Sequence, residues 1–264
     1  MHTAKILSLN LGGRLLEFDH PIVMGILNCT PDSFYAASRT QSEREIITRA
    51  EEIMVQGGAI IDIGGFSTRP GFAPVDQEEE IRRLAVALHV IRSRWPDVWL
   101  SVDTFRQEVA HYCIEEWGVQ LINNVSTSAF SPALPTEIPQ VVTSHAATIE
   151  QMLEDLSQRV EQLRQLGQHD IIIDPGFGFG KTIDENYSVL DQLSLLQALR
   201  CPLLVGLSRK SMLQAVAGVD AAHAQNATTA AHMAALQRGA NILRVHDVSE
   251  AVETIKIFEK LTSV

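Results

Sequence analysis

Short apolar runs alternate with longer amphipathic stretches from one end of the chain to the other. Eight of these runs are nearly continuous in apolar residues, which is typical of parallel strands that are buried on both faces. They predict strands over residues 22–27, 59–64, 98–103, 120–124, 140–143, 170–174, 202–206 and 241–245. The stretches between them carry apolar residues at helical spacing and predict helices over 42–56, 76–94, 106–117, 149–166, 184–199, 227–238 and 249–261.

The regular alternation of strands and helices predicts an α/β fold, a (β/α)8 TIM barrel. A doubly wound open sheet is the competing architecture, and it is less favoured because no dinucleotide-binding glycine fingerprint is present. One unit of the barrel is expected to be irregular. About fifteen residues separate the fourth and fifth strands, and three of them are Pro132, Pro135 and Pro139. A loop or a short turn is expected there in place of a full helix.

The N-terminal segment lies outside the count of eight units. Residues 5–18 predict two short strands around Gly12 and Gly13, which is the pattern of a β-hairpin that caps the bottom of the barrel. No internal repeat, low-complexity tract or linker interrupts the rest of the sequence. We therefore expect residues 1–264 to form a single domain.

The overall charge excludes some classes of partner. The chain has 264 residues with 21 Lys and Arg against 32 Asp and Glu, which gives a net charge of −11. Binding to nucleic acid or to an anionic membrane requires a basic surface, so neither is expected. An anionic substrate would need positive charges that are concentrated locally.

The sequence also indicates a compartment. It has no apolar segment of about 18 residues that could cross a membrane, and its N-terminus lacks the apolar core of a signal peptide. The three cysteines, Cys29, Cys113 and Cys201, are far apart and form no CxxC pair, which argues against a zinc ribbon or a disulfide framework. These features favour the reducing cytoplasm.

Polar residues mark the carboxyl ends of several predicted strands, where the active site of a TIM barrel lies. Asp103, Asn123 and Asp174 end the third, fourth and sixth strands. Each of them alone could cap a helix or pair with another of the three. Together they offer hydrogen-bond acceptors to a flat, nitrogen-rich heterocycle, and a carboxylate can accept two hydrogen bonds from an amidine-like edge.

Possible cations gather at the ends of the last two strands, namely Arg209, Lys210, Arg244 and His246. Surface salt bridges are the alternative explanation, but barrels often bind phosphate at this position, so an anion site is favoured. No P-loop motif is present, and the segment DPGFGFGK lacks the GxGxxG spacing of a Rossmann turn. Residues 31–38 and 67–72 predict long loops at the same rim, which could close over a substrate as lids.

A tightly held transition metal is not expected, because the nine histidines form no HxH or HExxH cluster. Mg2+ bound together with a diphosphate is compatible with the sequence, since it needs few protein ligands. Asn28, at the end of the first strand, could supply one oxygen.

Seven motifs in this order resemble the dihydropteroate synthase family: LNCTPDSF, GGAIIDIGGFSTRPG, SVDTFR, LINNVS, DPGFGFGKT, GLSRKS and RVHDV. The similarity extends from about Val23 to the last predicted helix. The resemblance implies a (β/α)8 barrel that is usually a homodimer. It also implies an enzyme of folate biosynthesis that joins 4-aminobenzoate to a dihydropterin methyl diphosphate and releases diphosphate.

The resemblance further implies roles for single residues, with Lys210, Arg244 and His246 as the catalytic set. The pterin would contact Asp103, Asn123, Asp174 and Lys210. The diphosphate and its Mg2+ would contact Asn28, Arg244 and His246, with Asn28 as the metal ligand. The 4-aminobenzoate pocket would be formed by Thr68, Arg69, Phe179 and Ser211.

The sequence departs from the family pattern in four places. Tyr35, Ala36 and Ala37 replace glycines, Phe66 replaces a common Glu, Asn124 replaces an Asp, and Thr143-Ser144 replaces a Met-His pair with His145 one position later. Two alternatives to a functional synthase therefore stay open. One is a divergent pterin-binding paralogue without synthase activity, and the other is a pterin-dependent methyltransferase domain.

Overall fold

The computed structural model describes residues 7–29, 39–66, 75–126 and 134–263. Eight parallel strands form the central sheet in the spatial order β8-β7-β6-β5-β4-β3-β10-β9. Their bounds are β3 (Ile22–Asn28), β4 (Ile60–Gly64), β5 (Trp99–Asp103), β6 (Leu121–Asn124), β7 (Gln140–Thr143), β8 (Ile171–Asp174), β9 (Leu204–Val205) and β10 (Ile242–Val245). Each predicted strand is thus present, within two residues at either end.

Few backbone hydrogen bonds join β8 to β9, where the sheet closes into a barrel. A single parallel bridge joins Ile173 to Leu203, and the Ile173 amide donates to the carbonyl oxygen of Pro202 at 2.9 Å. Pro202 has no N–H and cannot extend a hydrogen-bonded ladder, so β9 is shorter than the predicted strand over 202–206. The predicted TIM barrel is confirmed, as an eight-stranded barrel that is nearly closed.

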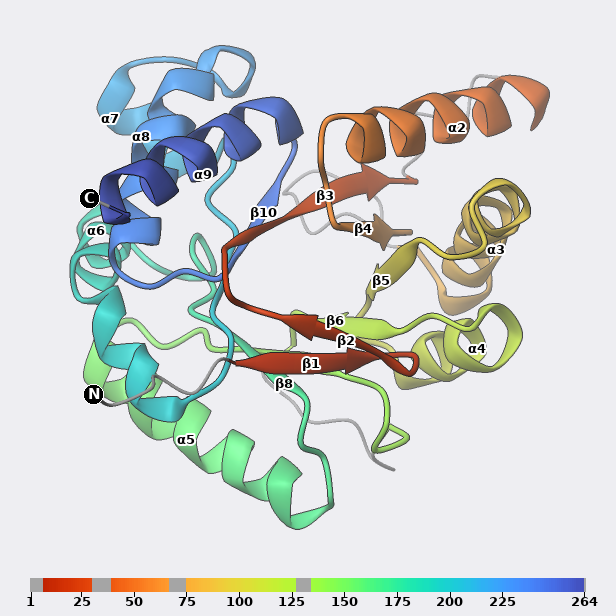
Figure 1. Cartoon of the computed structure of the whole chain (residues 1–264), viewed down its shortest axis with the longest axis horizontal. Helices are drawn as coiled ribbons and strands as arrows, with labels where there is room; N and C mark the ends of the chain where they lie inside the picture. Colours follow the sequence, from red (N-terminus) through yellow and green to blue (C-terminus); the bar gives the residue numbers. More distant parts are fainter. Residues whose placement is uncertain (1–6, 30–38, 67–74, 127–133, 264) are drawn as a thin grey trace.

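Helices surround the strands, as Figure 1 shows. The α-helices are α2 (Arg39–Val55), α3 (Gln77–Arg94), α4 (Gln107–Trp117), α5 (Ile149–Gln165), α6 (Ile183–Asp191), α7 (Ser211–Ala217), α8 (Gln225–Gln237) and α9 (Val248–Thr262). Two 3-10 helices, η1 (Leu193–Leu199) and η2 (Ala221–His223), complete the set in the described residues. None of these described helices is long and apolar enough to cross a membrane.

Two helical features differ from the sequence prediction, and a third agrees with it. The helix predicted over 184–199 is instead α6 followed by η1, in which the buried Leu193 and Leu196 are three residues apart, as a 3-10 helix requires. The seven-residue α7 was not predicted, because it is too short to show a helical period. Between β6 and β7 the described residues form no helix, as the prolines predicted.

The N-terminal hairpin closes the bottom of the barrel. β1 (Ser8–Leu11) pairs antiparallel with β2 (Arg14–Glu17), and Figure 1 shows the pair across one end of the strands. Leu9, Leu11 and Leu16 are buried in one cluster with side chains from the barrel interior. The predicted cap is therefore confirmed. That residues 1–264 form one domain stays a prediction.

The interior of the barrel has an apolar layer below a polar one. The apolar layer consists of Met24, Ile60, Leu121, Val141, Ile172, Leu204 and Ile242. Side chains on the same face of a strand are two residues apart. The next layer toward the carboxyl ends therefore contains Asp62, Asn123, Asp174 and Arg244. This alternation brings the polar residues of distant strands together at the mouth of the barrel.

Candidate active site

Arg244 is the centre of the polar layer. Its Nε donates to Oδ2 of Asp62 at 2.6 Å, and its Nη2 donates to Oδ2 of Asp103 at 2.6 Å. The side-chain amide of Asn123 donates from Nδ2 to the same oxygen of Asp62 at 3.1 Å. Three predicted site residues, from β5, β6 and β10, are therefore linked in one network with Asp62 on β4, which bonds to Asn123 and Arg244.

Asp62 was given no role from the sequence. It is fully buried, and it lies inside the apolar strand sequence IIDIG. A buried carboxylate is costly unless it is paired. An acidic residue within an otherwise apolar strand was the signal that could have identified it.

The polar layer presents open hydrogen-bond acceptors. A carboxylate can only accept, so the Nδ2 group of Asn123 must face Asp62 and its Oδ1 must face away. That Oδ1 is buried and has no hydrogen-bond partner among the described residues. The Oδ1 of Asp174 accepts from the Gly176 amide at 2.8 Å, which leaves the second carboxylate oxygen for a ligand. Such acceptors suit a heterocycle with N–H donors on its edge.

The segment after β8 folds tightly against the end of β7 and the Lys210 side chain. Gly176 has φ of 61°, and a Cβ there would lie 2.2 Å from the carbonyl oxygen of Ser144. The Gly178 amide donates to Asn186 Oδ1 at 2.8 Å, and a Cβ on Gly178 would lie 3.0 Å from Lys210 Cδ. The glycines of DPGFGFGK therefore allow close approach of the backbone to β7 and to the Lys210 side chain.

Gly176→Ala should destabilise the fold by at least about 3 kcal/mol, because strain at positive φ adds to a clash with fixed backbone. Gly180→Ala is the matched control. Its φ is 64° but nothing lies within 4 Å of the added carbon, so the strain alone should cost about 1–2 kcal/mol. Urea unfolding of both variants checks this. Equal losses of stability would mean that the contact with Ser144 is not rigid.

Lys210 and Phe179 lie together near Asp174, on the loops that follow β9 and β8. Lys210 precedes α7, its Nζ donates to the carbonyl oxygen of Phe177, and the same Nζ lies 4.7 Å from the centroid of the Phe179 ring. The Phe179 ring stacks on His145, with centroids 4.6 Å apart and planes at 8°. The sequence shows no sign of this stacking, and no role for His145 could be predicted from it.

Burial shifts the pKa values of the charged groups in this layer. It raises the pKa of Asp103 to about 7, against the attraction of Arg244 and with help from the neighbouring Asp62 carboxylate. Burial also raises the pKa of Asp174, and it lowers the pKa of Lys210 to about 8. For Arg244, burial acts to lower the pKa, but the carboxylates of Asp62 and Asp103 outweigh it and raise the pKa above its ordinary value.

Arg209 is committed to a structural ion pair. Its Nε and Nη2 donate to the two carboxylate oxygens of Asp247, each at 2.8 Å, and its Nη1 donates to the carbonyl oxygens of Ala221 and Ala222. Side-chain bonding to Asp247 raises the pKa of Arg209 and lowers that of Asp247. The salt-bridge alternative considered from the sequence therefore applies to Arg209.

The remaining predicted residues lie around the rim. Asn28 ends β3, Ser211 is the exposed first residue of α7, and His246 follows β10. The backbone of His246 is held on both sides, since its amide donates to Ser208 Oγ at 3.2 Å and its carbonyl oxygen accepts from Arg49 at 2.6 Å. The predicted 4-aminobenzoate residues Thr68 and Arg69, and the replaced glycine positions 35–37, lie outside the described residues.

Phe66, one of the departures from the family pattern, belongs to an aromatic and ionic cluster at the same rim. Its ring lies 5.4 Å from that of Phe105, edge to face, and both rings are near the Arg106 guanidinium. Arg106 also forms an ion pair with Glu80, which is fully buried. This second buried ion pair shares no hydrogen bond with the one around Arg244, although the Glu80 carboxylate contributes to raising the pKa of Asp103.

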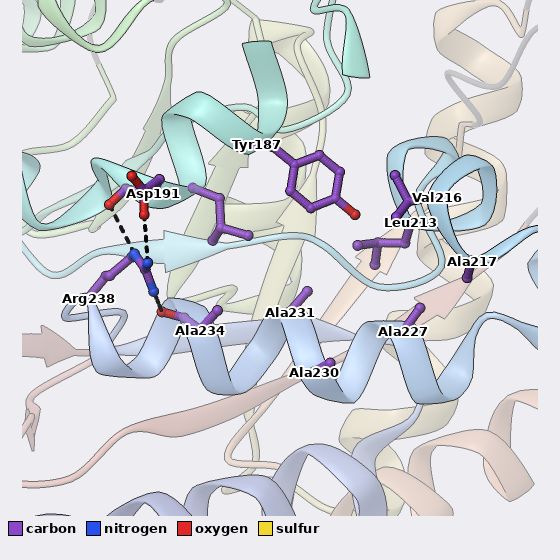
Figure 2. Close-up of a pocket in the computed structure, with 11 residues that line it drawn as sticks. Tyr187, Asp191, Leu213, Val216, Ala217, Ala227, Ala230, Ala231, Ala234 and Arg238 are labelled. Atoms are coloured by element: carbon purple, nitrogen blue, oxygen red, sulfur yellow. Dashed lines mark hydrogen bonds and ion pairs between the residues drawn. The ribbon is translucent and has the colours of Figure 1, made fainter. Parts of the chain in front are cut away.

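A pocket of about 410 Å³ lies elsewhere, on the outside of the barrel among α6, α7 and α8 (Figure 2). Its wall includes Ala227, Ala230, Ala231 and Ala234 of α8, and Arg238 bonds to Asp191 at its edge. None of the predicted site residues lines it. The convergence of polar groups, and not this apolar hollow, therefore marks the candidate active site.

A family model and curated relatives match most of the chain. A family model described as pterin binding enzyme matches residues 24–246. The chain is 35% identical over 270 residues to the dihydropteroate synthase of Escherichia coli strain K12, covering 95% of each protein. It is 38% identical over 265 residues to that of Synechocystis sp., covering 90% of this chain and 89% of the relative.

Solved structures of similar sequence share the fold. The Xanthomonas albilineans dihydropteroate synthase with 4-aminobenzoic acid superposes with a TM-score of 0.87 at 32% identity, covering 97% of this chain and 98% of that one. The same enzyme in complex with 7,8-dihydropteroate gives a TM-score of 0.85 at 30% identity, covering 97% and 99% of the two chains.

Proposed function

Since the chain belongs to the dihydropteroate synthase family of pterin-binding enzymes, we propose that it joins 4-aminobenzoate to (7,8-dihydropterin-6-yl)methyl diphosphate at the mouth of its barrel. The chain is a transferase of this type, and its products are 7,8-dihydropteroate and diphosphate. The observation that carries the assignment to this site is the convergence of acceptors and cations from strands far apart in the sequence.

The pterin is proposed to bind to Asp103, Asn123, Asp174 and Lys210. The buried Oδ1 of Asn123 and the open oxygen of Asp174 can accept hydrogen bonds from ring N–H and amino groups. Lys210 is a cation beside Asp174 and close to the Phe179 ring. This arrangement fixes the plane of a flat ligand while its methylene carbon faces the rim.

The diphosphate is proposed to lie toward Arg244, His246 and Asn28. As diphosphate leaves, its negative charge develops, and positive groups held in place lower the barrier. Arg244 stays protonated because Asp62 and Asp103 raise its pKa. The methylene carbon that loses diphosphate is conjugated with the pterin and can carry positive charge, and the aromatic amine attacks it without needing a strong base.

Mg2+ is proposed to bind with the diphosphate, where it would neutralise charge on the leaving group. No group of three His, Cys, Asp or Glu residues within the described ranges is arranged to hold a metal by itself. A single protein oxygen is enough when the diphosphate supplies other ligands. The side-chain oxygen of Asn28, beside Gly64 at the strand end, fits that requirement.

The 4-aminobenzoate is proposed to contact Phe179 and Ser211, together with Thr68 and Arg69. Phe179 offers an aromatic face that is held by stacking on His145. Ser211, at the start of α7, directly follows Lys210, so the two substrates would lie next to each other at these two residues.

Homodimer formation and a cytoplasmic location are further proposals. The family resemblance supports the dimer, and three buried cysteines that are free of disulfides support the cytoplasm.

Incubation with the pterin diphosphate, 4-aminobenzoate and Mg2+ tests the proposal. Formation of 7,8-dihydropteroate and diphosphate in equal amounts is expected. Binding of pterin without turnover would favour the divergent paralogue instead. Light scattering of the purified protein, with twice the monomer mass expected, tests the dimer separately.

The pH dependence of kcat/KM for the pterin diphosphate should be bell-shaped. Asp103, with a pKa raised to about 7 by burial, is a carboxylate only above that pH. Lys210, with a pKa lowered to about 8 by burial, is a cation only below that pH. The rate constant should therefore rise through about pH 7 and fall through about pH 8.

Lys210→Arg should keep the acid limb and remove the alkaline one, because a guanidinium does not lose its proton in this range. Initial rates between pH 5.5 and pH 9.5, roughly the range in which both groups titrate, provide the measurement. An alkaline limb that persists in Lys210→Arg would assign it to another group.

A further inference from the structure

We propose that Asp62 is a positioning residue, which acts on the pterin site through Asn123 and Arg244 without touching the substrate. The inference rests on the proposed function. It extends that function to a residue to which neither the family resemblance nor the comparisons give a role. Asp62 is fully buried on β4, in the same interior layer as Asn123 and Arg244. Both of its bonded neighbours belong to the site itself.

The first effect of Asp62 is on the orientation of an amide. The two ends of an Asn side chain are similar in size, and one donates where the other accepts. Since Asp62 Oδ2 accepts from Asn123 Nδ2 at 3.1 Å, the acceptor oxygen of Asn123 is turned toward the ligand. Without the charge on Asp62, the amide could rotate and place its donor against the donors of the pterin.

The second effect is on the guanidinium. Asp62 and Asp103 bind two nitrogens of Arg244, Nε and Nη2, each at 2.6 Å. Two contacts on a planar group fix both its position and the direction of its plane. Arg244 is thus held from β4 and β5 while its own backbone is on β10, and it needs no rearrangement when substrate enters.

The buried carboxylate is poorly explained by stability alone. Replacing a buried ion pair by apolar residues is often neutral or stabilising, so such a pair is weak support for a purely structural role. Glu80 offers the comparison within the same chain. It is equally buried and paired with an arginine, Arg106, but it has no bond to Asn123 or Arg244.

Asp62→Asn is therefore tested against Glu80→Gln, each in the full chain. With Asp62→Asn, kcat/KM for the pterin diphosphate should fall about 10–100-fold, as expected when a charge-assisted contact is lost. At saturating pterin diphosphate, the KM for 4-aminobenzoate should stay within about twofold. Glu80→Gln should leave kcat/KM for the pterin diphosphate within about threefold.

Equal losses in the two variants would overturn the proposal, because they would show a general effect of removing a buried charge. Unchanged kinetics in a folded Asp62→Asn protein would overturn it as well. If the unmodified enzyme showed no turnover, the proposed function would fail. Calorimetric titration of the same proteins with 6-hydroxymethylpterin would then still test the role of Asp62.

A measurement on the unmodified protein covers the case in which Asp62→Asn does not fold. In protein labelled with 15N at asparagine, the Asn123 side-chain amide should be protected from solvent exchange, both alone and with 6-hydroxymethylpterin bound. The NMR signal of this amide is assigned as the one that disappears in Asn123→Ala. Rapid exchange, or loss of protection when the pterin binds, would show that Asp62 does not hold this amide.

Discussion

Asp174→Asn should abolish measurable pterin binding. The Oδ1 of the new side chain can still accept from the Gly176 amide, as the native Oδ1 does at 2.8 Å, so the turn after β8 should survive. The other position changes from an acceptor oxygen to a donor NH2, which opposes the N–H groups of the pterin. Two charge-assisted hydrogen bonds are worth about 3–6 kcal/mol, which is more than 100-fold in affinity.

Asp170→Asn is the matched control for that change. Asp170 precedes β8 at the opposite end of the strand, and its Oδ1 accepts from the Asn10 amide at 3.2 Å. The substitution removes the same charge while keeping this bond, and pterin affinity should not change. Calorimetric titration of both variants with 6-hydroxymethylpterin gives the comparison. Normal binding by Asp174→Asn would mean that the pterin does not use this carboxylate.

Arg244→Ala should lower both stability and turnover. Removing the guanidinium leaves the buried Asp62 and the largely buried Asp103 without their cation, and breaking a buried pair in this way costs about 3–5 kcal/mol. The loss of a fixed positive group at the leaving diphosphate should also reduce kcat/KM by about 100–1,000-fold. Urea unfolding and initial rates measure the two effects separately.

Arg238→Ala is the control for Arg244→Ala. Arg238 bonds to Asp191 at 2.7 Å, and the Asp191 side chain is 75% exposed. An ion pair so exposed to solvent contributes about 1 kcal/mol or less to the free energy of unfolding. Stability should therefore change little, and turnover should not change. Full turnover by a folded Arg244→Ala protein would exclude Arg244 from the anion site.

The barrel could be predicted from the sequence because its signals are local. A buried parallel strand shows itself as an apolar run, as at 22–27 and 140–143, and each such run was found in the structure within two residues. The polar residues that end these runs could be located in the same way, because parallel strands direct their carboxyl ends to one face. Asp103, Asn123 and Asp174 were identified on this basis.

The features that the sequence did not predict have weak local signals. The seven-residue α7 is too short to show a helical period, and the predicted strand over 202–206 is only two residues long in the structure, as β9. The stacking of His145 on Phe179 joins residues 34 positions apart, on loops that follow different strands. No spacing in the sequence reports such a contact.

The sequence by itself determined which groups reach the mouth of the barrel, and the tertiary structure decided what each of them does there. In the sequence alone, Arg209 and Arg244 are equivalent cations at the ends of neighbouring predicted strands. The fold pairs Arg209 with Asp247 at the rim, and it ties Arg244 to Asp62, 182 residues away in the chain, and to Asp103. The energy with which a charged group interacts depends on its burial and on its partner. For Arg244, both are determined by the barrel, in which β10 lies beside β3 and within reach of β4 and β5.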